Sequence, residues 1–136
     1  YVVFTLPAFA RNLRNEIRKG RKIYFCDCGI RNAALGNFLP LESRTDVGVL
    51  WENYLMSERR KLLLAGGSSA RGYFWRTTGQ QEVDYIEETP AGLTAYEFKW
   101  RDKGRARVPR AFRDTYPDAG LEIISPENAE VFLEVH

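Results

Sequence analysis

Cysteine and histidine are scarce in this chain of 136 residues, which has two cysteines and one histidine. The cysteines stand in Cys26-Asp27-Cys28, and the histidine is the last residue, His136. A secreted disulfide framework uses more cysteines, and a structural zinc site uses four Cys or His ligands. The composition argues against both classes. We expect Cys26 and Cys28 to be ordinary strand residues in a reducing compartment, with a redox role as the alternative.

Long apolar runs and nucleotide-binding motifs are also lacking. No segment has membrane-spanning length or the pattern of a signal peptide, so we expect a cytoplasmic protein without a membrane partner. The stretch Gly66-Gly67-Ser68-Ser69 lacks the Lys-Ser/Thr that follows the last glycine of a phosphate-binding loop. Residue 1 is tyrosine and the only methionine is Met56. We therefore expect this chain to be part of a longer protein and to bind no ATP itself.

Aromatic residues are plentiful, with eight Phe, seven Tyr and three Trp. With 44% hydrophobic and 28% charged residues, the chain has the composition of one globular domain. We expect Trp51, Trp75 and Trp100 to lie in its core, because each falls on an apolar face of its element. The net charge of +2 permits nucleic-acid binding without arguing for it, and the oligomeric state stays open.

The hydrophobic pattern predicts an α/β fold. Apolar residues at helical spacing from Val47 to Leu62, after a possible N-cap at Thr45-Asp46, indicate a long helix that ends near Gly66. Shorter helices are expected at 30–35 and 108–116, and strands at 23–26, 73–77, 82–88, 93–100, 121–124 and 131–135. This order indicates a mixed sheet with helices packed on it.

Residues 82–100 predict an antiparallel hairpin around the turn Thr89-Pro90-Ala91-Gly92. If Thr89 pairs with Gly92, Asp84 lies opposite Glu97, although a bulge at Gly92 would shift this register by one residue. Side chains alternate along a strand, so Asp84, Glu97 and Lys99 are expected on one face. The apolar side chains expected together on the other face are Val83, Tyr85, Tyr96, Phe98 and Trp100.

Asp84 and Glu97 would repel each other across neighbouring strands, and a divalent cation between them would remove that cost. Carboxylate oxygens are ligands that Mg²⁺ prefers, and Mn²⁺ would serve as well. Lys99 would then act on an attacking water or stabilise charge on a phosphate. Glu52, at the edge of the long helix's apolar stripe, is the fourth candidate, because a carboxylate there needs a partner. The alternative is a charged solvent face without function.

Basic residues crowd the segment that follows Lys99. They are Arg101, Lys103, Arg105, Arg107, Arg110 and Arg113. A positive rim of this kind would hold the DNA backbone beside the acids without reading sequence. The alternative is a solvated loop followed by the polar face of a helix.

The order Glu52, Asp84, Glu97-Phe98-Lys99 on a helix and two strands resembles the PD-(D/E)xK nuclease superfamily, although Val83 stands where the superfamily name has proline. Several longer segments are also similar to the C-terminal domain of unknown function that follows the ATPase domain in bacterial and archaeal AAA-type ATP-binding proteins. These segments are 22–32, 46–53, 73–77, 82–86 and 96–100.

The resemblance implies a restriction-endonuclease-like mixed β-sheet flanked by helices over 23–136, with 1–22 as an arm or linker from a missing upstream region. It implies that Asp84 and Glu97 bind the metal, that Glu52 completes the site and that Lys99 is the catalytic lysine. The implied function is a Mg²⁺-dependent DNA endonuclease attached to an AAA-type ATPase domain. The alternatives are a catalytically inactive module that binds DNA or protein without a cofactor, and a purely structural domain that docks on its ATPase.

Overall fold

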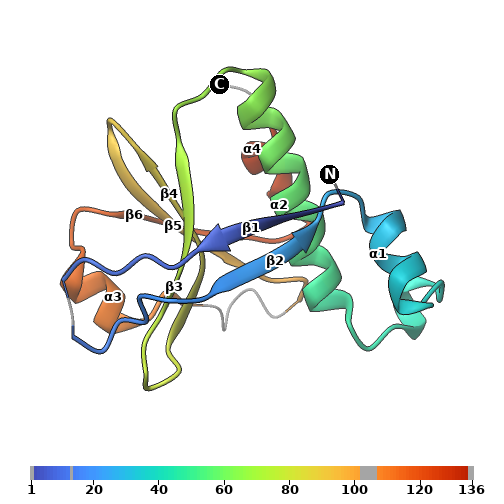
Figure 1. Ribbon diagram of the computed structural model, residues 1–136, viewed down its shortest axis with the longest axis horizontal. Coiled ribbons are helices and arrows are strands. Elements are labelled where there is room, and N and C mark those ends of the chain that lie inside the picture. Colours follow the sequence, from blue (N-terminus) through green and yellow to red (C-terminus); the bar gives the residue numbers. More distant parts are fainter. Residues whose placement is uncertain (1, 13, 102–106, 135–136) are drawn as a thin grey trace.

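The computed structural model describes residues 2–12, 14–101 and 107–134 (Figure 1). Its strands are β1 (Val3–Pro7), β2 (Arg21–Phe25), β3 (Arg71–Arg76), β4 (Glu82–Thr89), β5 (Gly92–Phe98) and β6 (Gly120–Ile124). Its helices are α1 (Cys28–Leu35), α2 (Val47–Ala65), α3 (Arg110–Thr115) and α4 (Ala129–Leu133), with a 3-10 turn at Leu41–Ser43. Within these ranges no helix is long and apolar enough to cross a bilayer. The fold is mixed α/β, as expected.

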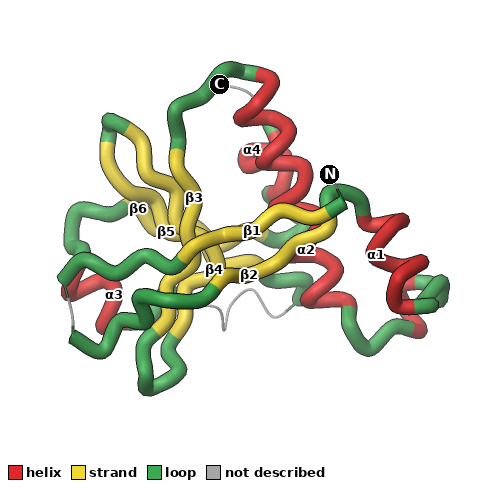
Figure 2. Tube along the Cα trace, viewed as in Figure 1, coloured by secondary structure: helices red, strands yellow, loops and turns green. Residues whose placement is uncertain are grey.

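Four strands form a mixed sheet in the order β3-β4-β5-β6, in which β6 runs parallel to β5 and the other neighbours are antiparallel. Strands β1 and β2 form a separate antiparallel pair that crosses over the larger sheet (Figure 2). The segment after β1 runs beside β3, where the Phe9 N–H donates to the Phe74 carbonyl at 2.7 Å. The described part of 1–22 therefore packs onto the same body as the rest of the chain.

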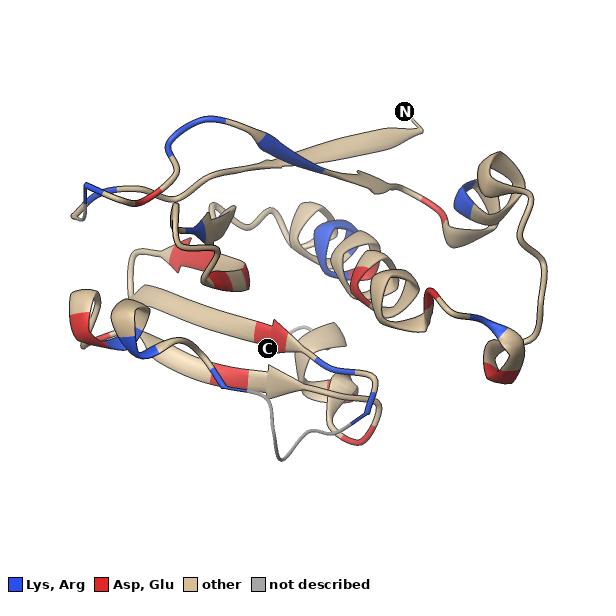
Figure 3. Ribbon diagram, turned by 90° about the horizontal axis from the view of Figure 1, so that it is seen from below, with Lys and Arg blue, Asp and Glu red and all other residues tan. Residues whose placement is uncertain are grey.

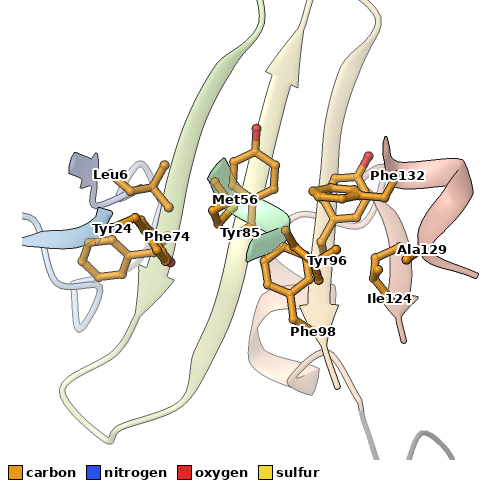
Figure 4. Close-up of a cluster of buried hydrophobic side chains, with 11 residues drawn as sticks. Leu6, Tyr24, Met56, Phe74, Tyr85, Tyr96, Phe98, Ile124, Ala129 and Phe132 are labelled. Atoms are coloured by element: carbon orange, nitrogen blue, oxygen red, sulfur yellow. The ribbon is translucent and has the colours of Figure 1, made fainter. Parts of the chain in front are cut away.

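Each face of the four-stranded sheet carries an apolar cluster. One cluster joins the sheet to α2, α4 and the β1-β2 pair. In Figure 4, Tyr24 and Leu6 lie next to Phe74 at one end of this cluster, and Phe132 of α4 lies by Tyr96 at the other. The second cluster joins the opposite face to α3. There the fully buried Trp75, a core residue as expected, packs edge-on against Phe112 with ring centroids 5.4 Å apart.

A β-bulge in β4 corrects one expectation about the hairpin. Tyr73 pairs with Ile86 and Trp75 pairs with Val83, so two residues of β4, Asp84 and Tyr85, lie opposite the single Phe74 of β3. The alternation of side chains shifts there. Val83 consequently belongs to the cluster on the α3 face and Tyr85 to the cluster on the α2 face, so these two do not share a face as predicted. Bulges of this kind commonly redirect a side chain next to a functional site.

The strand expected at 131–135 is also wrong, because residues 131–133 belong to α4, which ends at Leu133. The turn before α4 is fixed by Asn128, whose Oδ1 accepts from the Ser125 N–H at 2.8 Å and whose Nδ2 donates to the Ile123 carbonyl at 2.8 Å. Helical geometry buries Phe132 and leaves Val131 exposed. Packing of Phe132 on the sheet thus overrides the strand preference of a Val-Phe-Leu run.

Candidate functional site

Asp84 and Glu97, here called the acid pair, lie where β4 and β5 part. The ladder between these strands runs from Thr89–Gly92 to Tyr85–Tyr96, which confirms the predicted register and makes the acid pair the next position along it. Beyond the last backbone pair, the backbone N–H groups of the two strands donate to carboxyl oxygens of the acid pair instead of to backbone carbonyls. The Phe98 N–H donates to Oδ2 of Asp84 at 2.9 Å, and the Asp84 N–H donates to Oε1 of Glu97 at 3.3 Å. The two carboxyls therefore reach across the strand pair toward each other's strand.

Burial and the charge of a neighbouring carboxylate raise the pKa of each member of the acid pair. Burial, followed by the negative charge of Glu52, raises the pKa of Asp84 to about 6. Burial, followed by the charge of Asp84, raises the pKa of Glu97 to about 8, and the Glu97 residue is only 7% exposed. Positive charges on Lys22 and Lys99 oppose both increases. Ionising both Asp84 and Glu97 thus carries a free-energy cost that a bound proton or cation would remove.

Glu52 comes to the acid pair from α2, but it already has partners. Its Oε2 accepts from the Tyr24 hydroxyl at 2.5 Å and from Nζ of Lys22 at 3.1 Å, both from β2. The next residue, Asn53, fixes β2 against α2, because its side-chain amide bonds to both the N–H and the carbonyl of Phe25. Burial and Glu52 raise the pKa of Tyr24 well above its usual range, so the hydroxyl stays a donor.

Lys99 directly follows β5, which ends at Phe98. Its backbone N–H donates to the Ile124 carbonyl of β6 at 2.8 Å, so the neighbouring strand fixes its position. The residue is half-buried, and its positive charge acts on both members of the acid pair. Lys99 and Lys22 therefore bring positive charge to the acid pair from two different elements.

The structure groups all four predicted site residues, namely Glu52, Asp84, Glu97 and Lys99, through the hydrogen bonds and electrostatic interactions given above. Lys22 and Tyr24, which were not predicted from the sequence, complete the group. Their spacing on the strand was the available signal, because side chains two residues apart, such as Lys22 and Tyr24, point to the same face. A lysine on the same face as a core tyrosine needs an acidic partner. In this conformation, the described ranges contain no group of three or more His, Cys, Asp or Glu side chains arranged to hold a metal ion.

The predicted basic rim is described only in part. Arg101 and Arg107 are exposed, and Arg110 pairs with Asp114 at 3.3 Å in an exposed position. Lys103 and Arg105 lie outside the described residues. Figure 3 shows basic and acidic segments interspersed over the fold. An exposed ion pair contributes little to stability, and the role of the rim in DNA binding stays a prediction.

A family model described as "Domain of unknown function (DUF4143)" matches residues 47–133, which is more than half of the chain. The chain belongs to the DUF4143 family. This confirms the expected resemblance to a domain of unknown function. No curated protein and no solved structure matches the chain. In this DUF4143 domain the matched region contains Glu52, the acid pair and Lys99, whereas Lys22 and Tyr24 precede it.

Proposed function

We propose that this DUF4143 domain is a PD-(D/E)xK-like nuclease domain with a restriction-endonuclease-like fold, which hydrolyses phosphodiester bonds in DNA with the help of Mg²⁺ or Mn²⁺. The observation that carries the proposal is the acid pair. The carboxyls of Glu97, which is buried, and of Asp84, which is half-buried, adjoin each other at a strand end, with Lys99 two residues beyond Glu97. Such a pair weakens a sheet unless a cation or proton joins it. Because DUF4143 domains follow AAA-type ATPase domains, an upstream ATPase is the proposed partner domain.

The donor set fits a hard divalent cation. Asp84 and Glu97 offer oxygen ligands only, and Mg²⁺ commonly takes one or two carboxylates while keeping its waters. Glu52 would add a third carboxylate once it parts from Lys22 and Tyr24, which hold it in the structure. When bound, the ion would polarise the scissile phosphate and help to activate the attacking water.

The remaining chemistry belongs to side chains of the domain. Lys99 would stabilise the negative charge that develops on the phosphate as the water attacks. Both Lys22 and Lys99 favour the ionised form of the acid pair, which is the form that binds a cation. Tyr24 keeps its proton and holds the Glu52 carboxylate in place through the hydroxyl hydrogen bond. The bulge at Asp84 would serve to direct its carboxyl toward α2 and β2, from which Glu52 and Lys22 come.

The decisive experiment incubates the purified chain with supercoiled plasmid, single-stranded DNA and branched DNA in Mg²⁺ or Mn²⁺. We expect cleavage of at least one substrate, at least a hundredfold slower for Lys99→Ala and for Asp84→Asn. Lys61→Ala is the matched control, because this lysine on α2 is exposed and pairs with Glu58 in the same helix turn. Absence of cleavage by stoichiometric protein on all three substrates, or equal cleavage by Lys99→Ala, would reject the nuclease proposal.

A second candidate is a catalytically inactive nuclease-fold module that binds DNA or protein. Two observations favour it: Glu52 is already neutralised by Lys22, and the described ranges contain no ready three-ligand metal group. This candidate predicts DNA binding in EDTA that is unchanged by Mg²⁺ and weakened by Arg107→Ala. A steep fall of affinity with salt would indicate contacts to phosphates. Binding that needs Mg²⁺ and is lost in Glu97→Gln would instead favour the nuclease.

A further inference from the structure

A positively charged segment runs over residues 14–22 and enters β2 at its end. We call it the basic arm, and the nuclease mechanism uses only its last residue, Lys22. Its cations are Arg14, Arg18, Lys19, Arg21 and Lys22, and its single acidic residue is Glu16. The first four cations are exposed, whereas the half-buried Lys22 pairs with Glu52. The basic arm therefore presents four positive charges to solvent.

Glu16 does not offset these charges at the surface, because its side chain is buried. The residue is 3% exposed, and its carboxylate accepts hydrogen bonds from Nε1 of Trp75 at 2.5 Å and from the Tyr116 hydroxyl at 2.6 Å. The backbone N–H of Asn12 donates to the same carboxylate at 2.9 Å. The exposed charges of the basic arm are thus all positive.

No carboxylate among the described residues pairs with the four exposed cations of the basic arm. Nη1 of Arg18 donates to the Ala10 carbonyl at 3.3 Å, and Nη1 of Arg21 donates to the Gly20 carbonyl at 2.9 Å. Both acceptors are neutral. An arginine has a planar fork of donors that matches a phosphate, and a lysine adds a compact positive charge. These side chains can therefore bind an anionic partner without first breaking an ion pair.

The basic arm is fixed to the end of the sheet that carries the acid pair. The Ile17 N–H donates at 2.8 Å to the carbonyl of Arg76, the last residue of β3. The first residues of β4, which lead to Asp84, pair with this end of β3. At its other end the arm continues into Lys22, whose charge acts on both members of the acid pair. A polyanion bound along the arm would thus reach the acid pair.

We propose that the basic arm binds the phosphate backbone of DNA and positions the strand for the acid pair, without reading its sequence. The inference rests on the proposed function and assigns a substrate-binding surface to the segment before β2, separate from the predicted rim after Lys99. DNA fits because the proposed cleavage site is rich in carboxylates, so a negative substrate needs positive charge beside it. An acidic partner protein would match the charge, but it would not need the acid pair beside the arm.

The test measures the affinity of the chain for labelled duplex and single-stranded DNA in EDTA, where no cleavage occurs, over a range of NaCl concentrations. Each phosphate contact contributes about 0.9 to the slope of log K against log salt for a duplex and about 0.7 for a single strand. Arg14→Ala combined with Lys19→Ala should therefore flatten the slope by about 1.4–1.8. Between about 50 and 200 mM NaCl, the wild type should then lose about tenfold more affinity than this variant.

Two further double variants make the result specific to the basic arm. Lys61→Ala combined with Arg71→Ala removes two exposed cations elsewhere and should leave the slope unchanged. Arg14→Lys combined with Lys19→Arg keeps both charges of the arm and should keep the wild-type slope. Because Arg14 and Lys19 are exposed and make no hydrogen bond with the described residues, their replacement should leave the fold intact.

An unchanged slope in the alanine variant of the arm overturns the proposal and would leave the arm to an acidic partner protein. An equal change in the control at Lys61 and Arg71 also overturns it, as does a wild-type chain that binds neither form of DNA. The proposed function is tested separately by Lys99→Ala. A flattened slope without any cleavage would remove the nuclease and keep the basic arm, whereas cleavage with an unchanged slope would do the reverse.

Discussion

The Glu97 carboxylate accepts a hydrogen bond from the backbone N–H of Asp84, so the two acids that repel each other as charges are also linked through the backbone. Separating the two side chains to relieve the repulsion would cost this hydrogen bond and the one from the Phe98 N–H to Asp84. The repulsion is relieved by a proton at low pH or by a cation at higher pH, and both routes are open to measurement.

The folded protein should lose stability as the pH rises from about 4 to 8. The folded-state pKa values of Asp84 and Glu97 lie above their ordinary values, so the native state binds more protons than the unfolded state in this window, and the free energy of unfolding falls as the protons leave. One unit of pKa change corresponds to about 1.4 kcal/mol. Asp84→Asn should therefore be about 1–3 kcal/mol more stable than the wild type at pH 8, and this difference should shrink to less than about 1 kcal/mol at pH 4.

Urea unfolding of both proteins at the two pH values measures this difference. Glu122→Gln, which changes an exposed carboxylate on β6, is the matched control and should leave the pH dependence unchanged. Parallel pH profiles for Asp84→Asn and the wild type would show that the acid pair is not strained in the native state.

Mg²⁺ should stabilise the protein at pH 8 and have little effect at pH 5, where protons occupy the acid pair. A ligand at a hundred times its Kd adds about 2.7 kcal/mol to the free energy of unfolding. Thermal unfolding with and without MgCl₂ measures the gain, which Glu97→Gln should lose and Glu122→Gln should keep. An equal gain from NaCl at the same ionic strength would point to general screening instead of a bound ion.

Tyr24→Phe should destabilise the fold by about 1.5–3 kcal/mol, because it removes a buried hydrogen bond to the charged Glu52. The exposed Tyr54 on the same helix as Glu52 gives the matched control, Tyr54→Phe, for which we expect a change below about 0.5 kcal/mol. Chemical unfolding at pH 7 gives both values. Similar small losses in both variants would mean that the β2 contact does not hold Glu52.

Phe132→Ala should cost about 3–5 kcal/mol, since it empties a site where the ring packs on Tyr96 with centroids 4.9 Å apart. Val131→Ala, one residue earlier, should cost little because Val131 is 57% exposed. The contrast tests the helical geometry of α4 directly. If the segment were a strand with Val131 and Leu133 facing the sheet, the order of the two effects would be reversed.

Local rules predicted much of the site. The turn between Thr89 and Gly92 sets the hairpin register, and that register alone makes Asp84 and Glu97 neighbours. The apolar periodicity and the stop at Gly66 gave the long helix, with Glu52 near the edge of its buried stripe. These features depend on residues close in sequence or on a single strand pair, where turn chemistry and periodicity are decisive.

Features that depend on distant partners were not predictable in this way. The bulge at Asp84 and Tyr85 is a mismatch between β3 and β4, and neither strand shows it alone. The pairing of Glu52 with Lys22 and Tyr24 requires the docking of β2 on α2, which Asn53 provides. The helical form of 129–133 follows from the packing of Phe132 on the sheet.

The position of β2 has a practical consequence for protein production. A fragment trimmed to the family match at 47–133 would lack Lys22 and Tyr24, and with them the counter-charge of Glu52 and part of the cover over the sheet. Lack of activity in such a fragment would reflect the truncation rather than the chemistry of the family. Domain boundaries taken from the family match would separate Lys22 and Tyr24 from the Glu52 carboxylate that they hold.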